Sequence, residues 1–309
     1  MSQIIGFKIN SEIYDTQTAS ELGLEGTPIY FDNSQESLSI MRHTCAHLMA
    51  EAIKSLYPEA QFFVGPVVEE GFYYDFRVNQ KISEEDLKNI ESKMKEIAKK
   101  GEKITKYYLP RDKAIEKFKN DDLKQAVISR IPEGDGRLSI YSQGDFEDLC
   151  RGPHLPTLKL LNAFKLTKIA GAYLGGDEKA EMLVRIYGIA FADKESLNQY
   201  LHQMEEAKKR DHRKVGTEME LFTFDEEIGA GLPIWLPKGS RLRRNIENLL
   251  TKALIQRGYE PVRGPEILKS AVWKTSGHYA NYGENMYFTT IDGVEYGIKP
   301  MNCVGHIKV

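Results

Sequence analysis

Two short motifs of histidine and cysteine, far apart in the chain, most constrain how it can fold. The first, HxxxH, contains His43 and His47, and the second, CxxxH, contains Cys150 and His154. A spacing of i and i+4 places two side chains on one face of a helix. If the fold brings both pairs together, they form a pocket of three imidazoles and one thiol. Such a pocket either holds zinc or performs acid–base and hydrogen-bonding chemistry without a metal.

The first pair lies in a segment that predicts a long helix. Residues 37–57 contain neither Gly nor Pro, and Pro58 ends the run. An apolar stripe with helical spacing is formed by Met41, Cys45, Leu48, Ala52 and Leu56. Both histidines point roughly opposite this stripe. HxxxH alone favours two solvated or partly buried structural histidines. With CxxxH added, and no other histidine before residue 202, we favour a functional site.

Length and composition fit an intracellular enzyme of two or three domains. The chain has 309 residues, of which 41% are hydrophobic, enough for packed cores. Three widely spaced cysteines argue against a disulfide framework. The N-terminal region has no long apolar run, so we expect no signal peptide, no membrane helix and a cytoplasmic location. The net charge of −3 gives little indication of nucleic-acid binding, which local basic patches can still provide.

We predict the α+β fold class, with four segments along the chain. Residues 1–37 form a small strand-rich piece, with β character at 4–10 and 27–31. One α+β domain spans residues 38–192. Residues 193–214 form a polar helix whose final cations lie at 208–214, either as a solvated helix end or as contacts to nucleic-acid phosphates. Residues 215–309 belong to a second domain.

Local signals predict several elements of these domains. Strands are expected at 61–68, 72–77 and 183–191, and alternation along the second turns Phe72 and Tyr74 to one face and Tyr73 to the other. Ser83 begins a helix with Asp86 three residues on, close to a capping box, and Gly101 ends it. Ser240 begins a helix that runs to Gly258. Asp292-Gly293 closes a hairpin between 286–291 and 294–299.

Three sequence stretches together resemble the editing domain of bacterial threonyl-tRNA synthetases. They are HTCAHLMAEAI at 43–53, FFVGPVVEEGFYYDF at 62–76 and DLCRGPH at 148–154. A related pocket in alanyl-tRNA synthetase editing domains resembles a zinc site, whereas the threonyl enzymes use the same pattern without a bound zinc. The pattern itself fits either metal state. Residues 1–37 look like the second half of the ubiquitin-like module with which such enzymes often begin.

The resemblance implies hydrolysis of the ester that joins serine to threonine tRNA. His43 and His47 would position or activate the attacking water, because the pKa of histidine lies near neutral pH. Lys124 would stabilise the developing charge, although Lys124 taken alone is an ordinary surface lysine. Asp148, Cys150 and His154 would shape the pocket and bind the terminal adenosine and the serine hydroxyl, with Tyr74 at its border. Editing is needed because one missing methyl supplies only about 1–3 kcal/mol of discrimination.

The second domain resembles the start of a class II synthetase catalytic domain. Residues 258–265 resemble motif 1, a helix and strand ending in a proline, here Pro265, that builds the dimer interface. Residues 299–306 are similar to the active-site segment whose cysteine, here Cys303, ligates a catalytic zinc. Met301 and Cys303 would then contact the substrate, since zinc with an open position takes the amine and hydroxyl of threonine together.

The resemblance also sets expectations for partners and for the extent of the chain. Threonine tRNA, threonine, ATP with Mg²⁺, zinc and a homodimer are expected of the full-length family. The sequence stops at Val309, before motifs 2 and 3, the remaining zinc ligands and the anticodon-binding domain. We therefore expect a fragment that retains the editing half. The alternatives are a zinc-dependent hydrolase of another ester or amide that uses the four-residue pocket, and a non-catalytic tRNA-binding or dimerisation remnant.

Overall fold

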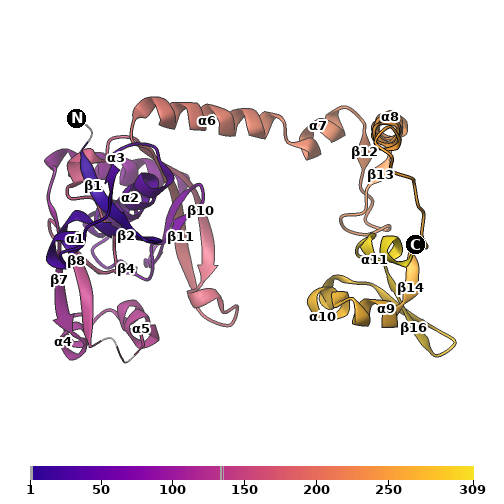
Figure 1. Cartoon of the computed structure of the whole chain (residues 1–309). Helices are drawn as coiled ribbons and strands as arrows, with labels where there is room; N and C mark the ends of the chain where they lie inside the picture. The colour runs from indigo at the N-terminus through magenta and orange to yellow at the C-terminus, as the bar shows by residue number, and fades with distance from the viewer. Residues whose placement is uncertain (1–2, 133, 135) are drawn as a thin grey trace. The chain divides into compact units, whose positions relative to one another are not determined.

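The chain divides into two compact units, Met1–Ala207 and Lys208–Val309. The structure is a computed structural model that describes residues 3–132, 134 and 136–309 (Figure 1). Both units mix helices with antiparallel sheets, so the expected α+β class is confirmed. In the described residues, no helix combines the length and the apolar character needed to cross a membrane.

The elements of the first unit are β1 (Ile4–Ile9), β2 (Glu12–Asp15), α1 (Thr16–Glu21), β3 (Thr27–Tyr30), α2 (Gln35–Leu56), β4 (Gln61–Phe62), β5 (Val67–Val68), β6 (Gly71–Arg77), α3 (Glu84–Lys100), β7 (Ile104–Pro110), α4 (Arg111–Lys117), α5 (Asp122–Arg130), β8 (Arg137–Gln143), β9 (Phe146–Leu149), η1 (Leu158–Leu160), β10 (Phe164–Tyr173), η2 (Leu174–Gly176), β11 (Met182–Ala190) and α6 (Lys194–Lys209), whose last two residues fall in the second unit.

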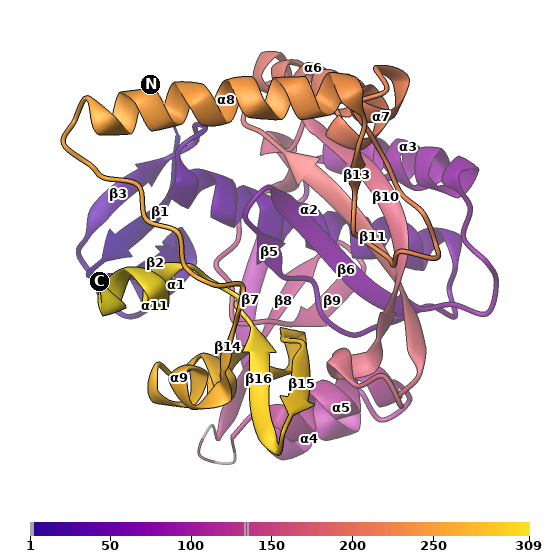
Figure 2. The same cartoon turned by 90° about the vertical axis from the view of Figure 1, so that its right-hand side faces the viewer.

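Helix α2 is the centre of the first unit. It packs against β6 and β11 of the main sheet and against α3, and Figure 2 shows it behind the ribbons of β6, β11 and β10. The predicted stripe is buried except at its end, where Leu56 is 39% exposed. The opposite face is not solvated, however, because Thr44 is fully buried and His47 is 3% exposed. The helix therefore has two packing faces, and the histidines occupy the second.

The main sheet is antiparallel with strand order β10-β11-β6-β4, and β5 also pairs with β6. Phe72 and Tyr74 face the core and Tyr73 is only partly buried, as the alternation predicted. The single strand expected at 61–68 is wrong, because it is interrupted between β4 and β5. Pro66 lacks an N–H for the ladder, and a side chain on Gly65 would lie 2.4 Å from the Tyr74 ring.

Helix α3 begins and ends where the sequence predicted. The Ser83 hydroxyl accepts from the Asp86 N–H, and the Asp86 carboxylate accepts from the Ser83 N–H, which completes the capping box. Gly101 ends the helix in the left-handed conformation with φ 68°.

Two smaller sheets complete the unit. The first has strand order β2-β1-β3, and it contributes Ile5 and Ile29 to the same buried cluster as α2. The boundary expected after residue 37 therefore does not separate two compact units. The second sheet, β7-β8-β9, carries the segment with Asp148 and Cys150.

The elements of the second unit are α7 (His212–Glu218), β12 (Phe222–Thr223), β13 (Ile234–Trp235), α8 (Pro237–Ile255), β14 (Ile267–Lys269), α9 (Ser270–Thr275), α10 (His278–Tyr282), η3 (Gly283–Asn285), β15 (Phe288–Ile291), β16 (Val294–Ile298) and α11 (Cys303–Lys308). The predicted hairpin is present as β15 and β16, with Asp292 at φ 49° and Gly293 at φ 74° in its turn.

Three expectations for residues 193–269 are corrected. The helix expected over 193–214 is broken between α6 and α7, because the Asp211 side chain accepts from the Arg213 N–H and caps α7. Helix α8 begins at Pro237 rather than Ser240, since proline at the first turn needs no hydrogen-bond acceptor. Residues 259–266 form no strand, and β14 begins only after Pro265.

Helix α8 leaves large apolar side chains in solvent. Exposures of 47–69% are found at Leu242, Ile246, Leu249, Leu250, Leu254 and Ile255. Ile267, on the edge strand β14 of the β14-β16-β15 sheet, is also exposed.

We expect α8 to open far more readily than α2 in the isolated chain. The two helices have similar lengths, 19 and 22 residues, but helices owe most of their stability to packing, and α8 is poorly packed. Hydrogen exchange at low protein concentration should show fast amides in α8 and slow amides in α2. Equal protection in the two helices would contradict this expectation.

Candidate active site

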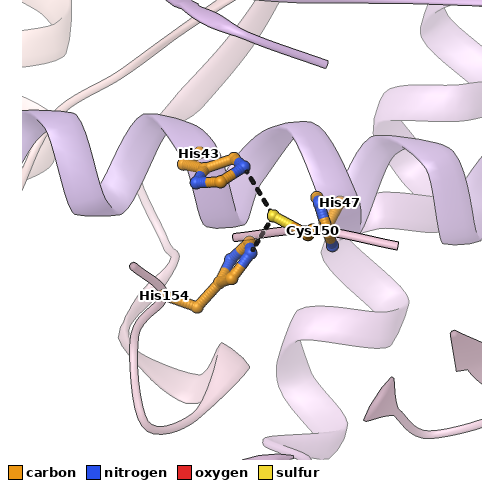
Figure 3. Close-up of side chains that lie close together, drawn as sticks. All are labelled: His43, His47, Cys150 and His154. Atoms are coloured by element: carbon orange, nitrogen blue, oxygen red, sulfur yellow. Dashed lines mark hydrogen bonds between the residues drawn. The ribbon is translucent and has the colours of Figure 1, made fainter. Parts of the chain in front are cut away.

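Four predicted side chains converge in the first unit. His43 and His47 extend from α2, and Cys150 and His154 lie in the segment after β9 (Figure 3). The sulfur of Cys150 lies 3.1 Å from Nε2 of His43 and 3.3 Å from Nε2 of His154. One potential ligand atom from each of the four residues lies within 4.8 Å of the others. The structure therefore assembles the pocket expected from HxxxH and CxxxH.

Hydrogen-bond partners fix which ring nitrogens carry hydrogen. Nδ1 of His43 lies 3.2 Å from the Pro153 carbonyl oxygen, which can only accept, so this nitrogen is the donor. The Thr44 hydroxyl donates to the Ile40 carbonyl at 2.9 Å. Nδ1 of His154, 3.3 Å from that hydroxyl oxygen, is then assigned as its donor. In both neutral rings Nε2 keeps a lone pair, and both lone pairs face the Cys150 sulfur.

The Cys150 thiol cannot satisfy both of these lone pairs. Its sulfur already accepts from the Gly152 N–H at 3.2 Å, and the thiol has one hydrogen to donate. One of the two Nε2 atoms is therefore left as an acceptor. A small polar molecule such as water can donate to it, which is the contact that a general base requires.

A buried charge cluster lies beside the imidazoles. Asp148, at the end of β9, is 1% exposed and forms an ion pair with Lys124 of α5. The Tyr74 hydroxyl also donates to this carboxylate. Lys124 donates further to the Phe63 carbonyl at 3.3 Å and to the Tyr74 oxygen at 3.4 Å. Its three N–H groups thus have three acceptors, which explains how a lysine can be 3% exposed.

Burial keeps the imidazoles and the thiol neutral. It lowers the pKa of His43 to about 4 and that of His47 to about 3, although the Asp148 carboxylate raises both. Burial also lowers the pKa of His154 and raises the pKa of Cys150 to about 12. Burial alone would raise the pKa of Asp148, but Lys124 and His47 lower it below its usual value. The site at neutral pH therefore holds neutral bases next to an ionised carboxylate.

The Nε2 lone pairs of His43 and His154, together with the Cys150 sulfur, could also bind a metal ion. Tetrahedral zinc with bonds of about 2.0–2.3 Å places its donor atoms roughly 3.3–3.8 Å apart. The sulfur-to-nitrogen distances of 3.1 and 3.3 Å are close to that range. The donor set of three imidazoles and one cysteine is also one that zinc accepts.

A cavity of about 630 Å³ adjoins the pocket at Cys150. Apolar side chains of Phe63, Val127 and Leu149 line it, and so do Arg130 and Arg137. The Arg130 guanidinium lies 5.0 Å from the centroid of the Phe63 ring. An apolar wall with cationic groups suits a planar base attached to phosphates.

The residues predicted in the second unit do not form a comparable site among the described residues. Cys303 is exposed, and its sulfur lies 3.7 Å from Nε2 of His278. These two donors fall short of the three that a catalytic zinc site needs. Met301 and Pro265 line a separate cavity of about 390 Å³.

Thr44 is a site residue that the sequence reasoning missed. Besides its contact with His154, its hydroxyl oxygen accepts from the Leu155 N–H at 2.9 Å, which ties α2 to the CxxxH segment. The only signal was its place inside the HxxxH motif, next to His43. Phe63 and Pro153 contribute backbone carbonyls to the hydrogen bonds of the site, and for such contacts side-chain identity carries no signal.

Comparisons with known proteins find a matching family segment and similar full-length chains. A family described as "Threonyl and Alanyl tRNA synthetase second additional domain" matches residues 138–187, which include Asp148, Cys150 and His154. The threonine–tRNA ligase of Helicobacter hepaticus is 75% identical over all 309 residues and 51% of its own length. The enzyme of a Sulfurovum species is 70% identical over 96% of this chain and 49% of its own length. That of Campylobacter lari is 68% identical over 99% of this chain and 50% of its own length.

The chain thus spans about half the length of the curated relatives it matches. A solved RNA-binding domain of threonyl-tRNA synthetase from Cryptosporidium parvum is 41% identical over 31% of this chain and 24% of that one, with a TM-score of 0.30. With identities of 68–75% along nearly the whole of its length, the chain belongs to the threonyl-tRNA synthetase family.

Proposed function

We propose that the first unit hydrolyses the ester between serine and threonine tRNA, and so edits mischarged tRNA. The observation that carries the proposal is the unsatisfied Nε2 lone pair of His43 or His154 beside Cys150. An acceptor of this kind, buried and neutral, is what a water needs in order to lose a proton while it attacks an ester carbonyl.

The charge cluster would assist this proton transfer. When an imidazole accepts a proton, the ionised Asp148 stabilises the cation, as its effect on the pKa of His43 and His47 indicates. Lys124 keeps Asp148 ionised through their ion pair. Because its three N–H groups already have acceptors, direct contact of Lys124 with the developing oxyanion would require it to exchange one of them.

The cavity beside Cys150 would hold the end of the tRNA. Its apolar wall can stack the terminal adenine, and Arg130 and Arg137 can face phosphates. The ester carbonyl would then lie toward Cys150 and the imidazoles, which supply the base. Holding the ester next to a positioned water is itself a large part of such catalysis.

The remaining activities of the family are proposed for the whole enzyme. They are charging of threonine tRNA with ATP and Mg²⁺, assembly as a homodimer in the cytoplasm, and zinc ligation by Cys303 with ligands other than those found near it in this structure. A zinc-dependent hydrolase that uses the four-residue pocket is not favoured by the relatives, and it is tested below.

Replacing the proposed base, or the carboxylate that stabilises its protonated form, should abolish most of the deacylation. His43→Ala and Asp148→Asn should each slow hydrolysis of seryl-tRNA by about 100-fold or more, since general bases contribute factors of this size. The measurement is single-turnover hydrolysis with saturating chain and threonine tRNA charged with serine. His202→Ala, at an exposed position of α6, is the matched control and should keep the wild-type rate. Wild-type rates in both site variants of a folded sample would refute the proposal.

The pH dependence should differ from that of a free histidine. Because the pKa of His43 is lowered to about 4, the neutral base is present throughout the range of about pH 6 to 8, and the rate corrected for spontaneous hydrolysis should not fall near 6.5. The unfolded chain binds these protons below about pH 6.5. Stability is therefore complete above that pH and decreases as pH falls toward 4. A midpoint near 6.5 in the activity profile of the folded chain would contradict this assignment.

Added zinc should inhibit the deacylation of seryl-tRNA rather than activate it. Zinc bound to Cys150 and the imidazoles would occupy the lone pairs that the base mechanism uses. A zinc-selective chelator should therefore leave deacylation unchanged, and excess zinc should slow it. Loss of activity on chelation, with recovery on adding zinc, would instead support the zinc-dependent hydrolase.

A further inference from the structure

The N-terminal ribbon, formed by β1, β2 and the start of α1, reaches to the back of the site. Asp15, the last residue of β2, is 4% exposed. Its Oδ1 accepts from the Thr18 N–H at 2.7 Å and caps α1, while its Oδ2 accepts from the Tyr141 hydroxyl at 2.5 Å. Both carboxylate oxygens of this buried group are thus used, one within the ribbon and one toward the sheet that carries the site.

Tyr141 lies between Asp15 and His154. Its side chain is 3% exposed, and its ring centroid lies 4.5 Å from that of His154. Its hydroxyl is pressed against the backbone of Gly152, where an added Cβ would lie 2.1 Å from that oxygen. Burial and the neighbouring Asp15 raise the pKa of Tyr141, so the hydroxyl remains a donor at neutral pH. The ring and hydroxyl therefore contact both ends of the segment 152–154.

Further contacts fix the ribbon on the β7-β8-β9 sheet. Gln17 donates to the Lys106 carbonyl at 2.8 Å and accepts from the Lys106 N–H at 2.9 Å. The Lys106 ammonium, in a residue that is 9% exposed, donates to the Thr18 hydroxyl at 3.0 Å. Lys106 is also 5.4 Å from the centroid of the Tyr141 ring. The position of Asp15 is thus defined by the sheet itself.

His154 is 2% exposed, and it borders a cavity of about 320 Å³. Asp15, Gln17 and Tyr141 line the same cavity. Thr44 and Cys150 contact the two nitrogens of the ring through hydrogen bonds. Tyr141 contacts the ring plane, and it is held in turn by Asp15.

We propose that Asp15, from the N-terminal ribbon, and Tyr141, from β8, are positioning residues of the editing site, which orient His154 toward Cys150. The proposal rests on the editing function proposed above. It assigns a role to residues 1–37, which the sequence identified only as part of a separate module. Neither residue touches the ester, so both act through the orientation of His154 and of the 152–154 backbone.

Tyr141→Phe and Asp15→Asn test this role in the complete chain. Each should lower the single-turnover rate of seryl-tRNA hydrolysis at saturation by about 10- to 100-fold, since displacements of about 1 Å cost factors of this size. The concentration of chain that gives half the maximal rate should stay unchanged. The double variant should be no slower than the single variants, because both remove the same hydrogen bond.

Tyr107→Phe is the matched control. Tyr107 lies on β7 and donates to the Glu147 carboxylate at 2.8 Å, so this variant removes the same type of hydrogen bond from the same sheet. It should lower the melting temperature by less than Tyr141→Phe, because this hydrogen bond is only partly buried, and it should leave the rate unchanged. A second readout is the ring nitrogen spectrum of His154 in 15N-labelled chain, which should shift in Tyr141→Phe but not in Tyr107→Phe.

The outcomes separate this inference from the proposed function. Suppose that the wild-type chain hydrolyses seryl-tRNA, that Tyr141→Phe does so at the same rate, and that the His154 spectrum of this variant is unshifted. This result would overturn the inference and leave the editing function intact. Equal rate losses in Tyr141→Phe and Tyr107→Phe would show a general loss of stability and would also overturn it. A folded wild-type chain without deacylation would refute the proposed function, and the His154 spectra would still decide whether Tyr141 orients that ring.

Discussion

The buried Asp148 carboxylate is the group on which the geometry of the first unit depends. A carboxylate that is 1% exposed must be paired and hydrogen-bonded, or it becomes protonated. Its partners come from different parts of the chain, Lys124 from α5 and Tyr74 from β6. Satisfying this one charge therefore holds a helix and a strand of the main sheet against the end of β9. Cys150, which directly follows β9, is thereby placed beside His43 of α2.

Local chemistry was sufficient to predict the elements whose ends depend on a few neighbouring residues. The capping box of Ser83 and the turn at Asp292-Gly293 formed where the sequence placed them, because their determinants lie within four residues of one another. The pairing of HxxxH with CxxxH was also predictable, since the residue types limit what such a pocket can do. The break at Gly65 was not, because it depends on the Tyr74 ring in another strand.

The surroundings of α2 and of Lys124 show where pattern reading failed. An apolar stripe predicts one packing face, but α2 is covered on two sides, so its polar residues Thr44 and His47 are buried as well. Lys124 has no sequence feature that distinguishes it from a surface lysine. Its burial is possible only because Phe63, Tyr74 and Asp148, all distant in sequence, supply acceptors. Tertiary partners of this kind cannot be deduced from spacing along one helix.

The choice between metal and acid–base chemistry comes down to how one thiol is used. With its proton retained, Cys150 satisfies one imidazole and leaves the other as a base, which suits ester hydrolysis by water. With its proton lost, the same sulfur and the imidazoles become a set of zinc donors. Burial, together with the nearby Asp148 carboxylate, raises the pKa of Cys150 to about 12. The Gly152 N–H and the ammonium groups of Lys124 and Lys106 act in the opposite direction and lower this pKa. In the metal-free pocket the surroundings thus favour the protonated thiol, which leaves one imidazole as an acceptor.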